Sequence, residues 1–423
     1  MNAPEFFFTD LDENRRPKGS RDPLGLEQIW SQVGRRMVGN LTTVTRHLDN
    51  FIIALTGFAV AAQGPQEREY TDTRSPEFYL RFERFEQLAA WARYVHERDG
   101  VIGRRMLGER NSERTGGPVE VGSGAAARIL GDQRRSGLWG LYSSALVGTG
   151  LIDAKRALTA DGHVLCKSFL ECYQSPAMET FREAMSATEK SVQVNPDMLV
   201  IDALLDCVGR EALGYRLLIE GGGRLQKDLW EFALANPLGH IEGPRELIAH
   251  LARTGEGVSG ELHDYAQKVE RLERVLVVVA TAFSDLMGRS RKTLAEVAEA
   301  FRLKHWGDRE AWVYLEIPQF GASFSPAWTQ RIGLLTEVVA HLRNAKIELF
   351  IETLLEFHAQ VMKERGGPAW VSLDAERYVR VIMGEGRVLK TPAELEGRWD
   401  NDYFLGAFVS LWKQTYRPGK RVE

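Results

Sequence analysis

The sequence predicts a mainly α-helical protein that ends in a small part of mixed α and β structure. Through most of the chain the apolar residues recur at spacings of three and four, the period of a helix buried on one face. Glycine and proline residues separate these runs, as is typical of helix ends. The two-residue alternation of a strand occurs mainly in the C-terminal third.

The composition is that of an ordinary globular protein. Of the 423 residues, 44% are hydrophobic and 26% are charged, which allows a sizeable core. The length suits roughly two to four domains. The formal net charge of −4 gives no overall basic field, so any binding of nucleic acid has to come from a local patch.

Features of secreted and membrane proteins are absent from the sequence. The N-terminus is acidic and aromatic, whereas a secretory signal begins basic and then becomes apolar. The longest apolar run, residues 51–62, is too short to span a bilayer. Cys166, Cys172 and Cys207 have neither zinc-ligand spacing nor the pattern of a disulfide framework. We therefore expect a cytoplasmic protein that does not enter a membrane.

Changes in composition divide the chain into four segments. Residues 1–23 are first acidic and then basic, broken by proline and glycine, which predicts an extended arm laid on a partner subunit. A helical region is expected over 24–175, a helical domain over 176–290, and a helical and α+β C-terminal domain over 291–423.

The first helical region has three strongly patterned runs. Residues 24–38 and 41–62 predict two helices, the second of them largely buried. Residues 78–95 carry an aromatic stripe at helical spacing, which is typical of core packing and not of base stacking.

The middle of the chain contains only helical signals. Gly221, Gly222 and Gly223 lack the lysine and hydroxyl residue of a phosphate-binding loop, and they follow a helix, so we interpret them as a helix-to-helix joint. Helices are expected over 198–210, 212–219, 225–235 and 263–287.

The last segment combines helix caps with short strands. Thr293 and Glu296 have the spacing of a capping box, and Thr391 precedes a proline at the start of a short helix. A single helix is expected over 326–365, long enough for an oligomer contact. Strands are expected over 312–320, 369–373 and 378–383, and a final helix over 400–416.

Residues 125–173 carry the most specific pattern. The expected order is a helix over 125–130, a turn, a helix over 137–149, a hairpin over 151–158 and a helix from Thr159. The stretches GLI and LTADGHVLCKSF within it resemble the winged helix-turn-helix superfamily. The resemblance implies an embedded winged-helix unit over 125–173. The sequence departs from the family pattern in one respect, because its wing would have only about four residues, which argues against contact of the wing with a minor groove.

The resemblance implies that the helix over 137–149 enters the major groove of DNA. Arg134 and Arg135 would then lie near one phosphate strand, and Lys155 and Arg156 near the neighbouring backbone. The outward positions of the helix carry no Arg, Asn or Gln that could contact a base edge, which favours recognition of the DNA backbone. The same pattern also fits a winged helix that packs against protein.

Residues 100–140 form the clearest basic region, with seven arginines against four carboxylates. This region adjoins the winged-helix segment, and a solvated loop with compensated charges is the other interpretation. The expected DNA-binding residues are Arg104, Arg105, Arg110, Arg114, Arg134, Arg135, Ser136, Trp139, Ser143, Lys155 and Arg156.

No catalytic motif of useful specificity is present. The histidines lack the HExxH spacing, and neither a nucleophile elbow nor a kinase motif set occurs. Asp374 and Glu376 come nearest to a nuclease pair, but no lysine follows at the strand position. No metal ion or cofactor is therefore expected.

These features together favour a non-enzymatic DNA-binding subunit of a larger prokaryotic DNA-processing or anti-phage defence assembly. Its expected partners are double-stranded DNA, other protein subunits and a second copy of the chain. The alternative is a scaffold whose winged helix binds protein, and a transcription regulator or a metal-dependent nuclease comes after both.

Overall fold

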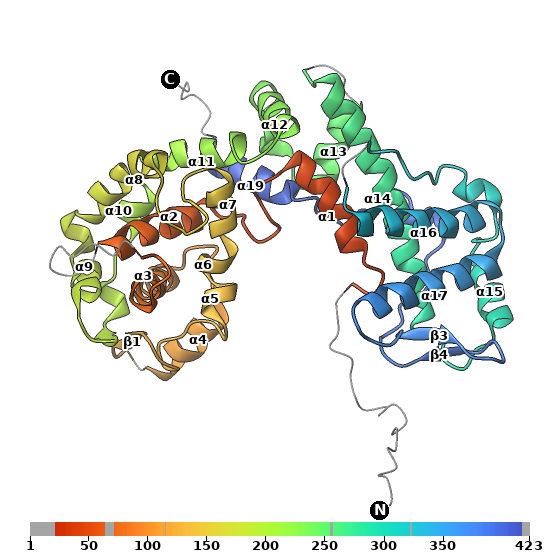
Figure 1. Cartoon of the computed structure of the whole chain (residues 1–423), viewed down its shortest axis with the longest axis horizontal. Coiled ribbons are helices and arrows are strands. Elements are labelled where there is room, and N and C mark those ends of the chain that lie inside the picture. The colour runs from red at the N-terminus through yellow and green to blue at the C-terminus, as the bar shows by residue number, and fades with distance from the viewer. Residues whose placement is uncertain (1–21, 64–71, 115, 254–256, 322–323, 417–423) are drawn as a thin grey trace, which may run out of the picture. The chain divides into compact units, whose positions relative to one another are not determined.

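The computed structural model describes residues 22–63, 72–114, 116–253, 257–321 and 324–416 (Figure 1). Helices account for 61% and strands for 5%, which confirms the mainly α-helical class. No helix within the described ranges is long and apolar enough to cross a membrane. Of the arm expected over residues 1–23, all but the last two residues lie outside the described ranges.

The chain folds as two compact units, each assembled from three segments. One unit comprises residues 34–247 with 256–262 and 402–423, and we call it the 34–247 unit. The other comprises residues 263–401 with 1–33 and 248–255, and we call it the 263–401 unit. Both units are therefore discontinuous in sequence.

The core of the 34–247 unit is built around α2 (Leu48–Ala62). Almost every residue of α2 is buried, since α3 (Pro76–Val95), α8 (Ala160–Tyr173) and α11 (Gly209–Ile219) all pack against it. A helix that is apolar on all sides requires such enclosure. The aromatic stripe of α3, from Phe78 to Trp91, is buried as expected.

Shorter elements complete this unit. The strands β1 (Val119–Gly122) and β2 (Ser191–Val194) form an antiparallel pair in which Val119 lies opposite Val194. The remaining helices are α4 (Arg104–Glu113), α5 (Gln133–Ser136), α6 (Leu138–Leu141), α7 (Ser143–Gly148), α9 (Glu179–Ser186), α10 (Asp202–Leu205), α12 (Arg224–Ala235) and α19 (Leu405–Thr415). The helices α1 (Leu26–Met37), α13 (Pro244–Arg253) and α14 (Gly260–Leu286) run across unit boundaries.

The 263–401 unit contains a helical hairpin where one long helix was expected. The single helix over 326–365 is wrong: α16 (Pro326–Arg343) and α17 (Ile347–Glu364) pack against each other. The break occurs at Ala345, whose φ of 56° lies in the left-handed region. No glycine or proline marks this turn, so the apolar pattern continues through it.

Other local signals of this unit are confirmed. Thr293 and Glu296 form a complete capping box at the start of α15 (Leu294–Arg302), and Thr391 caps α18 (Pro392–Leu395). The antiparallel strands β3 (Val371–Leu373) and β4 (Val379–Val381) give the C-terminal part its mixed character. The strand expected over 312–320 is absent from the described residues.

The structure does not confirm a winged-helix unit over 125–173. Residues 125–130 form turns instead of a helix, and the helix expected over 137–149 is divided into α6 and α7. The expected hairpin consists of the single bridge between Ile152 and Leu158. Helix α8 is confirmed, with the Thr159 hydroxyl accepting a hydrogen bond from the Gly162 backbone N–H.

A buried carboxylate explains why this segment departs from a regular helix. Glu86 on α3 accepts hydrogen bonds from the Leu138 backbone N–H at 2.5 Å and from the Gln133 side-chain amide at 2.9 Å. Gly137 passes over this carboxylate in an extended conformation, and a Cβ there would lie 2.5 Å from a Glu86 oxygen. The chain therefore ends α5 and begins α6 at Gly137.

Candidate nucleic-acid interface

Trp139 on α6 is part of the core of the 34–247 unit. Its side chain is only 4% exposed, and its ring centroid lies 5.4 Å from Phe58, 5.1 Å from Tyr79 and 5.1 Å from Phe82. Ser143 on α7 is buried as well. The outward orientation expected for Trp139 and Ser143 is therefore wrong, because these short helices turn those positions toward α2 and α3.

Two arginines cover the outer side of this aromatic group. The guanidinium carbon of Arg134 lies 5.0 Å from the Tyr79 ring centroid and 6.0 Å from that of Trp139. The guanidinium carbon of Arg156 lies 4.9 Å from the Trp139 centroid. Arg134 precedes α6 and Arg156 follows α7, so the folded chain brings two cations to one indole. We call Tyr79, Trp139, Arg134 and Arg156 the Trp139 cluster.

The two cations of the Trp139 cluster are poorly neutralised. Within the described residues, neither Arg134 nor Arg156 forms an ion pair with a carboxylate, and the buried Nε of Arg156 has no hydrogen-bond acceptor. Burial, and then the positive charge of Arg134, lower the pKa of Arg156. Such a pair of guanidinium groups has an unused capacity to bind an anion.

The backbone holds Arg156 in place. It occupies the left-handed region, with a φ of 69°, in a turn closed by Asp153. The Asp153 carboxylate accepts hydrogen bonds from the Lys155 and Ala157 backbone N–H groups at 2.8 and 2.9 Å. The Lys155 carbonyl accepts a hydrogen bond from the Thr73 hydroxyl, which ties the turn to the start of α3. Arg156 is therefore presented by a constrained turn.

Acidic groups near the cluster have other roles. Asp132 caps α5 by accepting a hydrogen bond from the Arg135 backbone N–H at 3.0 Å. Burial raises the pKa of Glu83, although the charge of Arg128 opposes the shift. Burial is also the largest cause that raises the pKa of Tyr79, followed by the charges of Glu83 and Glu86. Within the described residues, none of these carboxylates forms an ion pair with Arg134 or Arg156.

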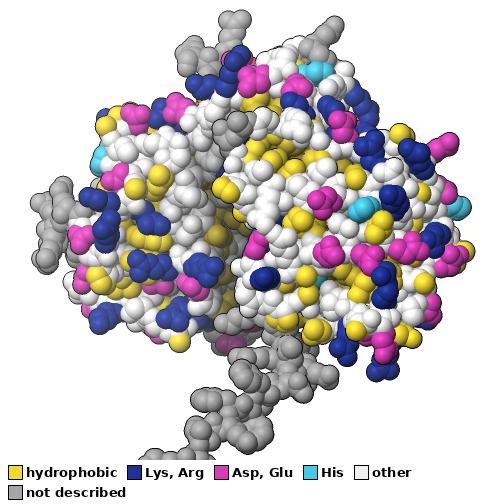
Figure 2. Space-filling view, turned by 45° about the vertical axis from the view of Figure 1, so that its right-hand side comes forward, with side chains coloured by type: hydrophobic (Ala, Val, Ile, Leu, Met, Phe, Trp, Pro, Cys, Tyr) yellow, Lys and Arg dark blue, Asp and Glu magenta, His cyan; other side chains and the backbone are white. Residues whose placement is uncertain are grey.

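Three other expected residues lie beside the cluster in the chain and are exposed. Arg135 and Ser136 directly follow Arg134 in α5, and Lys155 precedes Arg156 in the turn. Figure 2 shows basic and acidic side chains interspersed over the visible face. The Trp139 cluster is therefore identified by the chemistry of its side chains and not by the size of a basic patch.

The expected arginines of α4 are engaged in other contacts. Arg114 forms an ion pair with Asp197 at 2.8 Å, and Arg105 forms one with Glu109 at 3.5 Å. Arg110 donates a hydrogen bond to the Ala125 carbonyl, and Arg104 donates one to the Arg98 carbonyl. Arg104 and Arg114 also line a polar cavity of about 500 Å3. Arg104, Arg110 and Arg114 thus contact neighbouring segments of the folded chain, whereas the pair of Arg105 with Glu109 lies exposed within α4.

Sequence reasoning missed Tyr79, the second ring of the cluster. Tyr79 directly follows the buried stripe residue Phe78 on α3, and the only sequence signal is an aromatic residue beside that stripe. No group of three or more histidine, cysteine, aspartate or glutamate side chains within the described ranges could hold a metal ion. Comparisons with protein-family models, curated proteins and solved structures give no match.

Proposed function

We propose that the chain binds the backbone of double-stranded DNA through the Trp139 cluster, as a non-enzymatic subunit of a larger assembly. The observation that supports this is the convergence of Arg134 and Arg156 on one indole with no carboxylate ion pair in the described part of the chain. DNA-processing or defence assemblies of prokaryotes are the setting that we propose for such a subunit.

The chemistry of the cluster suits a phosphate diester. A guanidinium group donates two parallel hydrogen bonds to phosphate oxygens, and an aromatic face holds its plane in position. Less side-chain freedom is then lost on binding than for a mobile lysine. Exposed Arg135 and Lys155 would contribute further phosphate contacts.

The burial of Trp139 and Ser143 argues against the reading of base edges by α6 and α7. Contacts to phosphate position a protein on DNA but carry no sequence information. The proposal therefore specifies binding that is independent of sequence and sensitive to salt.

The test is a fluorescence-anisotropy titration of the full chain with a mixed-sequence duplex at about 50 and 200 mM salt. The double variant Arg134→Glu/Arg156→Glu should lose at least about tenfold in affinity at the lower salt, since each phosphate contact contributes about one counterion to the salt slope. The matched control is Lys227→Glu/Arg245→Glu, which changes the net charge equally at two exposed residues of the same unit.

Equal affinity losses in the two double variants would show that only net charge matters, and would overturn the role of the cluster. Absence of duplex binding by the unchanged protein at 50 mM salt would overturn DNA as the ligand. An acidic protein segment could use the same two guanidinium groups, and capture of a co-expressed partner that depends on Arg134 and Arg156 would then favour the adaptor function.

A further inference from the structure

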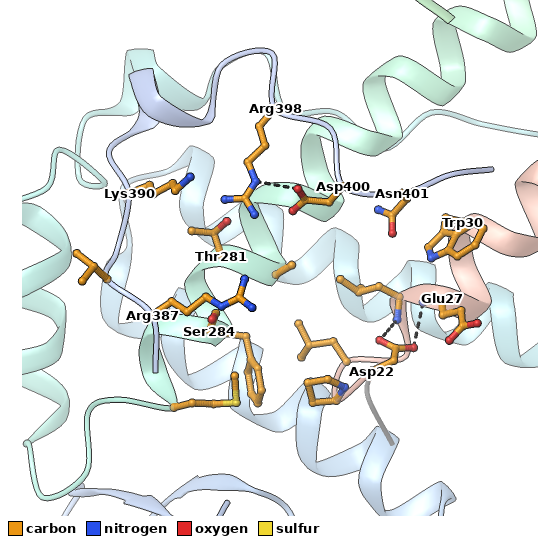
Figure 3. Close-up of a pocket in the computed structure, with 17 residues that line it drawn as sticks. Asp22, Glu27, Trp30, Thr281, Ser284, Arg387, Lys390, Arg398, Asp400 and Asn401 are labelled. Carbon is orange, nitrogen blue, oxygen red and sulfur yellow. Dashed lines mark hydrogen bonds and ion pairs between the residues drawn. The ribbon is translucent and has the colours of Figure 1, made fainter. Parts of the chain in front are cut away.

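The 263–401 unit contains a cavity of about 470 Å3 that no part of the proposed function uses (Figure 3). Its walls come from the start of α1, from the C-terminal half of α14 and from the segment 387–401 that surrounds α18. The volume lies within the roughly 300–1,000 Å3 that small-molecule sites occupy.

One end of the cavity is cationic. Arg387, Lys390 and Arg398 gather there in Figure 3, beside the hydroxyl groups of Thr281 and Ser284 on α14. Arg398 forms an ion pair with Asp400 at 2.8 Å. Arg387 and Lys390 have no ion pair among the described residues, so two positive charges remain available at this end.

The backbone around this end is fixed by contacts with α14. The Arg387 backbone N–H donates a hydrogen bond to the Ser284 carbonyl at 3.0 Å. Gly386 packs on Gly288 so closely that a Cβ on Gly386 would lie 2.2 Å from the Gly288 Cα. The loop that carries Arg387 is thus seated directly on the end of α14.

A buried carboxylate on α14 holds Asp400 and Asn401 in place beside the cationic end of the cavity. Glu273 on α14 is fully buried and accepts hydrogen bonds from the Asp400 and Asn401 backbone N–H groups at 2.6 and 3.0 Å. It also accepts one from the Asn401 side-chain amide at 2.9 Å. Asp400, and with it the Arg398 guanidinium, is therefore held at a set position.

The other end of the cavity is acidic and aromatic. Figure 3 places Asp22, Glu27 and Trp30 there, away from Arg387, Lys390 and Arg398. Asp22 accepts hydrogen bonds from the Leu26 and Glu27 backbone N–H groups, so its carboxylate caps α1. The exposed Glu27 and the half-buried Trp30 also line this end, so a carboxylate and an indole ring border the cavity here.

We infer that this cavity binds a nucleoside monophosphate. A phosphate monoester carries a charge of about −1.5 to −2 at neutral pH, which matches the two unpaired cations Arg387 and Lys390. The indole of Trp30 suits stacking with a planar base, and Glu27 can accept hydrogen bonds from amino or hydroxyl groups. This site is independent of the proposed DNA interface, since every residue lining it belongs to the 263–401 unit.

The test is isothermal titration of the full chain with AMP, GMP, CMP and UMP, with adenosine and inorganic phosphate as partial ligands. At least one nucleotide should bind more tightly than either partial ligand. Arg387→Ala/Lys390→Ala should weaken that binding by roughly tenfold or more, because each charged hydrogen bond contributes about a factor of ten. Arg309→Ala, an exposed arginine of the same unit outside the cavity, should leave it unchanged.

Three results would overturn the inference: no nucleotide binding, phosphate binding as tight as nucleotide binding, or equal binding by the Arg387→Ala/Lys390→Ala variant. Because Arg387 is exposed, its truncation leaves the core intact, and Arg387→Lys should restore part of the affinity. Duplex titrations of the same variants separate the two proposals, since loss of the nucleotide site should leave duplex binding unchanged.

Discussion

The Trp139 cluster and the cavity of the 263–401 unit both gather cations, but they hold them differently. The guanidinium carbons of Arg134 and Arg156 lie 5.0 Å from the Tyr79 ring centroid and 4.9 Å from that of Trp139, respectively. Arg387 and Lys390 come from a loop and line a half-open cavity that is acidic at its far end. The first arrangement suits the extended polyanion that we propose as its ligand, whereas the second offers a cavity of about 470 Å3 to a small ligand.

The difference shows that positive charge alone does not identify a ligand. The chain has a net charge of −4, and its basic side chains are interspersed with acidic ones. In both regions the cations have no carboxylate ion pair in the described structure, a property that they share with other exposed cations such as Lys227 and Arg245. What surrounds those groups, rings in one case and cavity walls in the other, then favours DNA or a nucleotide.

The largest effect that separates the two regions is expected from Trp139→Ala. Removing an indole that is 4% exposed should lower the free energy of unfolding by about 3–5 kcal/mol and remove the support of both arginines. Urea denaturation measures the first effect, and duplex titration measures the second. Nucleotide binding by the 263–401 unit should persist.

Trp139→Phe is the control, because a phenylalanine retains part of the ring contact with Tyr79 and Phe82. It should fall between the wild type and Trp139→Ala in both measurements. Loss of nucleotide binding by a folded Trp139→Ala protein would contradict the independence of the two regions.

A second effect concerns pH and the buried carboxylate beneath the cluster. Burial raises the pKa of Glu86 from 4.5 to about 7, despite the hydrogen bonds from Leu138 and Gln133. The folded state therefore binds this proton more tightly than the unfolded state does. Its stabilisation is fully present below pH 4.5 and is lost as pH rises through about 7, a change of about 3 kcal/mol.

Urea denaturation of the wild type and of Glu86→Gln between pH 5 and 8 measures this contribution. The amide cannot ionise, so the variant should lack the part of the pH dependence that Glu86 supplies. Parallel pH profiles for the two proteins would refute the assignment.

Local sequence signals predicted the parts of the fold that depend on nearby residues. The caps at Thr159, Thr293 and Thr391 are confirmed because each hydroxyl acts within its own first turn. The break at Ala345 was not predicted, since a left-handed alanine leaves no mark on the apolar pattern. The division of 137–149 depends on Glu86, which lies some fifty residues earlier, so no local pattern could show it.

The residues of the candidate sites, too, could be predicted only in part, because their final positions depend on distant segments of the chain. Sequence analysis identified Arg134, Arg156 and Trp139 as candidate site residues but predicted that the indole points outward. Helical spacing alone does not show which face of the segment 137–149 is covered by α2 and α3. Tyr79 joins the cluster only through packing. Arg387 and Lys390 follow no motif, and their relation to α1 and α14 arises only when three distant segments form one unit.

The smallest effect tests whether ring-held geometry matters beyond charge. Arg156→Lys keeps the positive charge but loses the planar fork and its position over Trp139, so duplex affinity should fall roughly two- to fivefold with little change in salt slope. Arg135→Lys is the matched control, because Arg135 is exposed and contacts none of the rings named above.

If both lysine variants bind the duplex equally well, affinity depends on charge alone, and the contrast between cations held on rings and cations facing a cavity loses its basis. A deficit confined to Arg156→Lys would instead show that the aromatic support contributes to binding, because only the geometry of the cation differs between the two substitutions.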